Sequence, residues 1–456
     1  MKSELNKAVS MKDSGIERLS EVPEYWEARR LKDILTYTKG YAFKSEDFVD
    51  SGTPVVKATD IKQYRILEPT SFINSSTIES YKKVLLKKND IVIATVGSQP
   101  NIVDSAVGQL ARIDEKTAGS LLNQNTLIIR IKTKRISNKF IYYILISEFF
   151  RQHLSLIARG TANQSSIKVS ETLEYLLFLP PFDEQEAIAH YLDTKTDQID
   201  RKIDLLTQKA ALYGNLKQSL INETVTRGLD KSVPMKDSEI KWLGDVPEHW
   251  DIKRLKDVIE NLESGVSVNA ENLPAQIDEY GILKTSCVNK YGFNPIENKT
   301  ILPEEISRAK CSPRQGSIII SRMNTPELVG ASGFVDKDYP KLFLPDRLWQ
   351  TVFHRNPRIN SKWLSYLLSV TRLKEVISFS ATGSSPSMKN LAQEDFLCIK
   401  IFTPPLSEQK AIADYLDTKT AKIDQIIQII NTQIEKLKEL RKTLINDVVT
   451  GKIKVV

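Results

Sequence analysis

Residues that commonly mark a disulfide framework or a metal site are scarce in this chain of 456 residues. The three cysteines, Cys287, Cys311 and Cys398, all lie in the second half of the sequence, and none has a counterpart in the first half. We therefore expect reduced, incidental thiols of a cytoplasmic protein rather than disulfides. The four histidines are scattered and form no cluster with the cysteines, so the sequence predicts no metal site.

Long apolar segments are missing too. No run of 18 apolar residues occurs, which argues against a transmembrane helix and against a membrane partner. The first 15 residues have no apolar core of the kind that a secretory signal needs. Both observations predict a cytoplasmic location.

Motifs of nucleotide chemistry are absent as well. The chain has no GxxxxGK[ST] phosphate loop and no Gly-rich strand-to-helix turn that would suit a nucleotide cofactor. LPPF at 179–182 is similar to the Asn-Pro-Pro-aromatic motif of amino-methyltransferases but lacks the Asn that would hold the amine. EQK at 408–410 could end a nuclease carboxylate–lysine motif, yet its copy is EQE at 184–186. We therefore predict no catalytic, cofactor-binding or metal-binding residue, and interpret LPPF as a proline stop before the long helix and EQK as a solvated first helical turn.

The sequence does contain an internal repeat. Three blocks recur at a constant offset of 224: 11–35 with 235–259, 180–196 with 404–420, and 220–226 with 444–450. The intervening inserts, 36–179 and 260–403, are almost unrelated. A repeated frame around two different inserts predicts a pseudo-twofold molecule that recognises two different targets. The segment after the second copy aligns with the linker after the first, so we expect the two termini to lie near each other.

Each copy ends in a long helix. Apolar positions alternate spacings of three and four over more than four heptads, which predicts a coiled coil rather than a solitary surface helix. These seam positions are Leu192, Thr196, Ile199, Ile203, Leu206, Ala210, Tyr213, Lys217, Leu220 and Thr224, then Leu416, Thr420, Ile423, Ile427, Ile430, Ile434, Leu437, Arg441, Leu444 and Val448. The simplest partner for one helix is its copy, paired antiparallel within the chain. Asp183 and Ser407 are the expected N-caps.

One seam position is basic in both copies, Lys217 in the first helix and Arg441 in the second. A polar seam residue lowers stability but fixes the register of a coiled coil. The alternative is that this end of each seam simply meets solvent. The sequence alone leaves both interpretations open.

The two inserts share a pattern of strands and helices. Strand-like runs at 89–97 and 126–132 in the first correspond to 316–323 and 349–355 in the second. One amphipathic helix follows in each, at 137–158 and at 360–381. We therefore expect two α+β domains of one fold with different surfaces.

Three polar loops in each insert are candidates for binding DNA. They follow the first strand, precede the second strand and follow the helix, and they are rich in side chains that hydrogen-bond base edges. The candidate residues are Ser98, Gln99, Asn101, Asn123, Gln124, Asn163, Gln164 and Lys168 in the first insert, and Arg322, Asn324, Arg347, Ser384, Ser385 and Lys389 in the second. Such residues also dominate ordinary surface turns. The net charge of +7 is compatible with a polyanion but does not decide between the two.

A tryptophan recurs beside a proline in both leaders, as Trp26 and Trp250. It could stack on a base. Because reading residues should differ between the two copies, we expect instead that each tryptophan packs its leader against its insert.

The order of leader, variable insert, PP-x-x-EQ-x-AIA-x-YLD-x-KT block and long helix, given twice, resembles the specificity subunit of type I restriction-modification systems. The leaders VPE-x-W-x-x-x-RLKD at 22–33 and 246–257 and the EQ-x-AIA-x-YLDTKT blocks at 184–196 and 408–420 carry the resemblance. It implies an α+β fold with two similar α/β target recognition domains, separated by two long helices that pair as an antiparallel coiled coil. The implied segments are a leader (1–19), recognition domain (20–182), central spacer helix and linker (183–235), second recognition domain (236–406) and C-terminal spacer helix (407–456).

The resemblance further implies a non-catalytic subunit that binds double-stranded DNA, each domain reading one half of an asymmetric gapped site. Its implied partners are two modification subunits that use S-adenosylmethionine to methylate adenine, and restriction subunits that cleave DNA with ATP and Mg. The chain itself would hold no cofactor. The remaining alternative is a coiled-coil adaptor whose inserts bind proteins rather than DNA.

Overall fold

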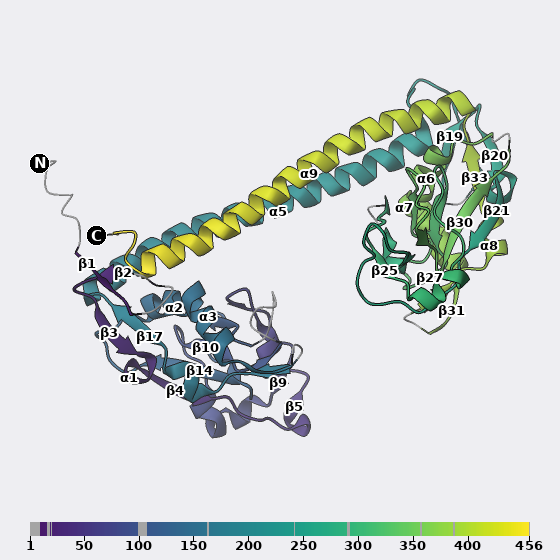
Figure 1. The fold of residues 1–456 in the computed structure, drawn as a ribbon. Helices are drawn as coiled ribbons and strands as arrows, with labels where there is room; N and C mark the ends of the chain where they lie inside the picture. The colour runs from purple at the N-terminus through teal and green to yellow at the C-terminus, as the bar shows by residue number, and fades with distance from the viewer. Residues whose placement is uncertain are drawn as a thin grey trace, which may run out of the picture. The chain divides into compact units, whose positions relative to one another are not determined.

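The computed structural model describes residues 10–15, 19, 21–98, 107–161, 164–240, 242–289, 292–355, 358–385 and 388–455. The chain forms two compact units, residues 1–206 with 432–456, and residues 207–431. Each unit contains one insert and a part of both long helices, whose course along the chain can be followed in Figure 1.

The first unit is built around a four-stranded antiparallel sheet in the order β12-β10-β14-β4. Its strands are Leu110–Arg112, Ile91–Ala94, Thr126–Ile131 and Leu35–Lys39. Ile91 and Ile93 point into one core cluster, and Val92 and Ala94 point into another. Because both faces of the sheet are buried, β10 is an unbroken apolar run instead of an alternating one.

A smaller sheet, β13-β6-β9-β5, covers one side of this core. Its strands are Leu121–Leu122, Thr53–Val56, Phe72–Ile73 and Phe48–Val49, with β13 parallel to β6. The other side is covered by helices α2 (Asn138–Ile146) and α3 (Glu148–Ile157).

The second unit repeats this architecture. Its main sheet has the order β21-β30-β26-β28, with strands Ile259–Ser264, Leu348–Phe353, Ile318–Ser321 and Ser332–Phe334. The small sheet β25-β22-β29 (Asn298–Thr300, Gly281–Leu283, Leu342–Phe343) again has one parallel pair. Helices α6 (Ser361–Leu368) and α7 (Thr371–Ser380) take the places of α2 and α3. The expectation of two similar α+β domains is therefore confirmed.

The prediction of one helix in each insert was wrong, because each insert has two shorter helices with a break between them. Ser147 has an extended backbone (φ −66°, ψ 156°), and its hydroxyl accepts a hydrogen bond from the N–H of Phe150. A side chain of a long helix completes the new helix start: Asn446 Oδ1 accepts from the N–H of Glu148 at 2.9 Å. In the second unit Asn222 Oδ1 accepts from the N–H of Thr371 at 3.2 Å. The break thus serves to dock each insert on a helix from the other copy.

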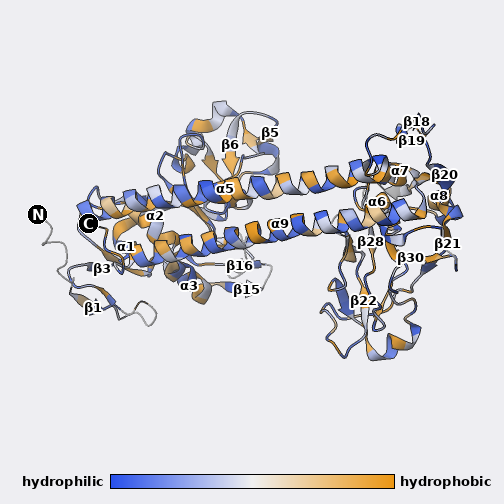
Figure 2. Cartoon of the chain, turned by 90° about the horizontal axis from the view of Figure 1, so that it is seen from above, coloured by the Kyte–Doolittle hydropathy of each residue, from blue (hydrophilic) through white to orange (hydrophobic). Residues whose placement is uncertain are grey.

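The long helices are α5 (Phe182–Arg227) and α9 (Leu406–Val449). In the first unit the start of α5 packs against the end of α9, around Leu192 and Val448. In the second unit the end of α5 packs against the start of α9, around Val225 and Leu416. All predicted seam positions are buried or half-buried, and apolar residues recur among hydrophilic ones along both helices (Figure 2). The antiparallel coiled coil is confirmed.

The basic seam residues form the same cross-helix ion pair in each unit. Arg441 Nε donates to Asp200 Oδ1 at 3.0 Å, and Lys217 Nζ donates to Asp424 Oδ2 at 2.6 Å. The offset that relates Lys217 to Arg441 also relates Asp200 to Asp424. A slip of one turn would separate both pairs, so these residues fix register and do not merely end the seam in solvent.

The predicted N-caps were each wrong by two residues. The helices begin at Phe182 and Leu406, so Asp183 and Ser407 lie inside the first turn. The carbonyl oxygens of Pro181 and Pro405 instead accept the first helical hydrogen bonds, from the N–H groups of Gln185 and Gln409. Proline stops the preceding strand and, lacking an N–H, leaves no donor unsatisfied at this point.

The glutamine of each EQ pair joins three segments of its unit. Gln185 Oε1 accepts from the N–H of Ser137 at 2.9 Å, and its Nε2 donates to the carbonyl of Pro180 at 2.8 Å. Gln409 makes the same two bonds, to Asn360 at 2.7 Å and Pro404 at 2.8 Å. The EQ segment lies at the helix start, as expected, but its glutamine is a buried structural joint and not part of a solvated turn.

The aspartate of each YLD segment anchors the insert on the long helix. Tyr143 donates its hydroxyl to Asp193 Oδ1 at 2.7 Å, and Lys139 Nζ lies 2.6 Å from Asp193 Oδ2. Tyr366 and Lys362 hold Asp417 in the same way. Burial would raise the pKa of Asp193, but Lys139, Tyr143 and Arg112 outweigh it and hold the pKa below the usual carboxyl value.

The leader tryptophans are core residues, as expected. Trp26 is 1% exposed and meets Phe140 edge-on, and Trp250 is fully buried and stacks on Phe402 with ring centroids 5.0 Å apart. The strand that follows each tryptophan, β3 (Glu27–Arg30) or β20 (Asp251–Arg254), pairs with the strand that precedes the long helix, β17 (Leu176–Leu179) or β33 (Lys400–Thr403). Gly451, beyond α9, has a positive φ of 75° and approaches Trp26, so the C-terminal segment lies on the N-terminal leader.

We predict that Asp200→Ala destabilises the first unit more than Asp424→Ala destabilises the second. The Asp200 side chain is 26% exposed and Asp424 is 54% exposed, so solvent screens the second pair more. The expected loss in free energy of unfolding is about 1–2 kcal/mol for Asp200→Ala and under about 1 kcal/mol for Asp424→Ala. Urea-dependent hydrogen exchange of peptides from each unit measures both, and equal losses would contradict the ranking.

A second prediction concerns acid. Because the folded-state pKa of Asp193 is lowered, its stabilisation is present above the unfolded-state pKa of about 3.9 and is lost as pH falls further. Asp193→Asn should therefore lower the free energy of unfolding by about 1–2 kcal/mol at neutral pH. This difference in free energy from the unmodified chain should shrink below about pH 4. The matched control is Asp197→Asn, at an exposed site on the same helix. A difference that stays constant down to pH 3 would exclude this contribution.

Candidate nucleic-acid interface

In the first unit, two of the three candidate loops meet in one small sheet. β11 (Val96–Gly97) pairs with β16 (Gln164–Ser166), which pairs with β15 (Arg159–Thr161). The register places Val96 opposite Ser166 and Gly97 opposite Ser165. The loop after the first strand and the loop after the helix are therefore joined by main-chain hydrogen bonds.

The second unit builds the same sheet from unrelated residues. β27 (Met323–Asn324) pairs with β32 (Met388–Asn390), and β32 pairs with β31 (Thr382–Ser385). Met323 lies opposite Asn390 and Asn324 opposite Lys389. We call these two three-stranded sheets, β11-β16-β15 and β27-β32-β31, the reading sheets.

One residue ties the third loop to each reading sheet. In the first unit the N–H of Thr95 donates to the carbonyl of Asn125 at 2.7 Å, and the Thr95 carbonyl accepts from the N–H of Ile167 at 3.0 Å. In the second unit Arg322 takes this position. Its N–H donates to the carbonyl of Arg347 at 3.0 Å, and its carbonyl accepts from the N–H of Leu391 at 2.8 Å. All three predicted loops thus converge in both units, through main-chain atoms.

A fourth segment, which the sequence analysis missed, completes each cluster. It follows the edge strand β4 or β21 and begins with Gly40 or Gly265. A Cβ at Gly40 would lie 1.8 Å from the carbonyl oxygen of Asn123, and one at Gly265 would lie 1.5 Å from that of Leu344. Only glycine allows this approach. A glycine directly after a strand in both copies was the signal that could have revealed it.

The fourth segment brings new side chains to the interface. Tyr41 is 46% exposed, its carbonyl accepts from the N–H of Gln124 at 2.8 Å, and its ring meets Phe43 and Tyr81 edge-on. In the second unit Ser267 donates its hydroxyl to the carboxylate of Asp346. An exposed aromatic ring therefore stands beside one cluster and a hydroxyl–carboxylate pair beside the other.

The predicted residues of the first unit occupy different situations. Gln124, Gln164 and Lys168 are exposed, and Lys168 Nζ lies 3.9 Å from Glu171. Asn123 is half-buried, and its Oδ1 accepts from the N–H of Gln124 at 2.8 Å. Ser98 follows β11 directly. Gln99, Asn101 and Asn163 lie outside the described residues.

In the second unit several predicted residues are engaged inside the cluster. The Arg322 guanidinium lies 5.6 Å from the centroid of the Trp349 ring, its Nη2 is 3.4 Å from Asn390 Oδ1, and its buried Nε meets no acceptor among the described residues. Asn324 Nδ2 donates to Ser321 Oγ at 3.2 Å, and Lys389 Nζ donates to the carbonyl of Ser378 at 2.8 Å.

The remaining predicted residues of this unit are Arg347, Ser384 and Ser385. Arg347 is exposed. Ser384 and Ser385 lie on β31, and their side chains are not among those that the structure describes. Arg347 and the fixed Arg322 therefore bring guanidinium groups to this cluster, and their planar donor forks suit bidentate binding of a base edge or a phosphate.

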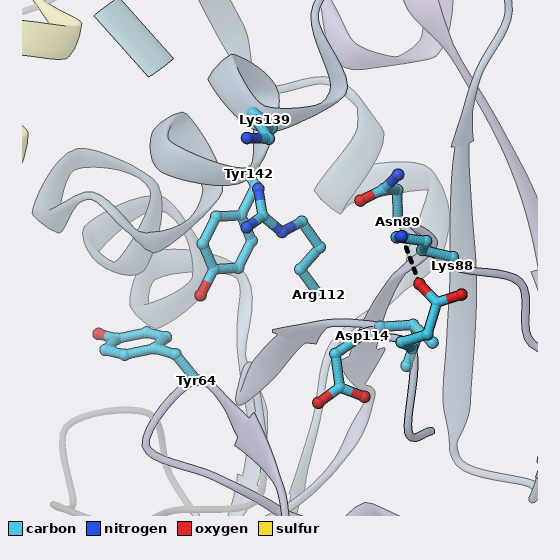
Figure 3. A pocket seen from close by; sticks show the side chains of 9 residues that line it. Tyr64, Lys88, Asn89, Arg112, Asp114, Lys139 and Tyr142 are labelled. Carbon is cyan, nitrogen blue, oxygen red and sulfur yellow. Dashed lines mark ion pairs between the residues drawn. The ribbon is translucent and has the colours of Figure 1, made fainter. Parts of the chain in front are cut away.

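The first unit also contains a pocket of about 440 Å³ (Figure 3). None of the candidate residues lines it. Its charges are of both signs, and Lys88 pairs with Glu115. Arg112 lies over the ring of Tyr142 at 5.3 Å, and burial raises the pKa of Tyr142 to about 12. We assign this pocket no ligand.

The described residues show neither a cluster of metal ligands nor a membrane-spanning helix. Across the described ranges, no three His, Cys, Asp or Glu side chains gather as ligands for a metal ion. Within the same ranges, no helix combines the length and apolar character needed to cross a membrane.

A comparison with protein-family models matches the type I restriction modification DNA specificity domain at residues 23–211 and again at 247–438. The two matches cover most of the chain and fall one on each repeat. The chain therefore belongs to the family of type I restriction-modification specificity subunits.

Curated relatives align over nearly the full length. The type I restriction enzyme MjaVIII specificity subunit of Methanocaldococcus jannaschii is 26% identical over 448 residues, covering 95% of this chain and 94% of the relative. The EcoKI specificity subunit of Escherichia coli K12 is 22% identical over 446 residues, covering 95% and 90%. A solved chain from a study of complex assembly and conformational transition in a type I restriction-modification system has a TM-score of 0.65 at 17% identity, covering 95% of this chain and 99% of that one. That likeness supports the fold.

Proposed function

We propose that each unit of this specificity subunit reads one half of an asymmetric gapped DNA site through its reading sheet and the loops around it. The observation that carries the proposal is a shared backbone with different side chains. The position that ties the loops together is Thr95 in one unit and Arg322 in the other, and the loop before the second strand presents Asn125 or Arg347. A common framework with different donors and acceptors is what two different half-sites require.

The base-reading roles follow from side-chain chemistry. Arg322 and Arg347 suit the O6 and N7 acceptors of guanine, and Gln124 and Gln164 suit the N6 and N7 edge of adenine. Arg322 is already oriented by Trp349 and Asn390, so little rotamer entropy is lost on binding. Lys168 and Lys389 carry positive charge to the same clusters and suit phosphate contacts. Ser98, Asn123, Asn324, Ser384 and Ser385 support these contacts or contribute further hydrogen bonds.

The chain would act without catalysis of its own. Its partners would be two modification subunits that methylate adenine with S-adenosylmethionine, and restriction subunits that use ATP and Mg. Two copies of one partner fit a frame that occurs twice, since the EQ joint and the YLD anchor that hold each unit together internally are the same in both units. A protein-binding adaptor has no comparable support, because no observation on the inserts favours a protein ligand.

The first test is single-molecule methylome sequencing of a host that expresses the neighbouring methyltransferase subunit, with and without this chain. We expect a two-part N6-methyladenine motif that appears only with the chain. Unchanged methylation despite assembly of a soluble complex would favour the adaptor instead.

Single substitutions should then assign half-sites to units. Arg347→Ala should relax the motif in one half and Gln124→Ala in the other, each losing about 1–3 kcal/mol of discrimination at one base pair. Arg201→Ala, at an exposed position on α5, is the matched control and should leave the motif unchanged. Relaxation of both halves by one substitution would contradict the division between units.

The helices should set the gap. Insertion of four residues in register into both α5 and α9 should lengthen the unspecified gap of the motif and preserve both half-site sequences. The reason is that the seam would be extended while neither cluster is touched. Methylome sequencing of the lengthened chain measures the gap, and altered half-sites with an unchanged gap would exclude the spacer role.

A further inference from the structure

The two units expose a large apolar side chain at the same place. Leu156 is 86% exposed and Phe379 is 84% exposed, and each is the ninth residue of its helix, α3 or α7. Single exposed apolar residues are common on protein surfaces. Here, however, an exposed apolar residue recurs at the equivalent position of two inserts whose sequences are almost unrelated. Because neither side chain is buried, folding does not explain this recurrence.

The buried inner faces of α3 and α7 hold these two helices in a fixed orientation. Leu154 and Ile377, two positions earlier, are buried, and each packs on a glycine. A Cβ at Gly108 would lie 2.7 Å from Leu154, and one at Gly330 would lie 2.3 Å from Ile377. Since this close contact fixes the rotation of each helix, Leu156 and Phe379 are held outward.

Both residues border the reading sheets. α3 ends at Ile157 just before β15, and α7 ends at Ser380 just before β31. In the second unit Lys389 of β32 bonds the carbonyl of Ser378, and its Nζ lies 5.9 Å from the centroid of the Phe379 ring. A ligand that covers the reading sheet would therefore reach the apolar side chain.

The charges around these positions identify the class of ligand. Just beyond α3, Arg159 and Lys168 both pair with Glu171, and in the second unit Lys389 lies over the ring of Phe379. Basic residues around an exposed Leu or Phe are the pattern of DNA-binding proteins that insert an apolar wedge between base steps and hold the adjacent phosphates. A ligand that covers both positions must accommodate these cations, and duplex DNA, the ligand proposed for the reading sheets, supplies phosphates for them.

We propose that Leu156 and Phe379 are wedges that unstack a base step of duplex DNA, one at each half of the recognised site. This inference rests on the proposed function of the reading sheets. It adds a deformation of the duplex that hydrogen bonding to base edges does not require. Because Leu and Phe differ in size and stacking ability, the two halves would be deformed to different degrees.

The test uses the full chain assembled with its methyltransferase subunit, and duplexes with the motif from methylome sequencing and 2-aminopurine at successive positions of each half. For the unmodified complex we expect, in each half, a fluorescence rise at one position other than the adenine to be methylated, because methyltransferases turn that adenine out of the duplex without any wedge. Phe379→Ala should abolish the rise in one half and weaken binding about tenfold. Leu156→Ala should do the same in the other half, and Phe379→Leu should keep most of the rise. Ile277→Ala, at a loop position of the second unit that is 90% exposed, is the matched control.

Three results would overturn the proposal. One is unchanged affinity and fluorescence in Phe379→Ala and Leu156→Ala. Another is a methyltransferase subunit that no longer assembles with either variant, as seen by size-exclusion chromatography, which would assign these side chains to a protein interface. The third is an equal loss in both halves from one substitution. Failure of the proposed function is distinct, because the unmodified complex would then show no gapped motif.

Discussion

The antiparallel seam between the two long helices is the constraint on which each unit depends. An insert is not held by its own helix alone. In the first unit Asp193 of α5 accepts a hydrogen bond from the hydroxyl of Tyr143, and Asn446 of α9 caps the start of α3. Both contacts can form together only in one register of the seam. Asp200 and Arg441 define that register, and Asp424 and Lys217 repeat it in the second unit. The register therefore fixes how each recognition domain is seated on its pair of helices.

These contacts explain which parts of the sequence are the same in the two copies of the repeat. Gln185 and Gln409 join three segments with the same two hydrogen bonds, and Trp26 and Trp250 fill the same place under the leader. Each of these side chains has a partner that must also be kept, so a change at one position leaves a buried polar group or a cavity at another. The recurring blocks are thus the parts of the chain where contacts connect different elements.

The sequence carried enough information for the frame and less for the candidate interface. A heptad seam is a local pattern, and every seam position proved at least half-buried. The break at Ser147 was missed because it depends on Asn446, which is distant in the chain. The segment after Gly40 was missed because its partner, Asn123, is reached only through sheet pairing. Polar composition pointed to loops that converge in the structure, but it did not reveal that Lys389 already bonds the carbonyl of Ser378.

The main-chain character of the loop junction has a consequence for how such a protein can diverge. Thr95 and Arg322 hold their loops together with N–H and carbonyl groups, which every residue except proline supplies. The side chain at this position is therefore free to be a small hydroxyl in one unit and a guanidinium stacked on Trp349 in the other. If side chains had joined the loops, each new specificity would have required a new way to close the cluster. With the backbone closing it, a change of side chain alters what the surface can bond while the position of that surface is retained.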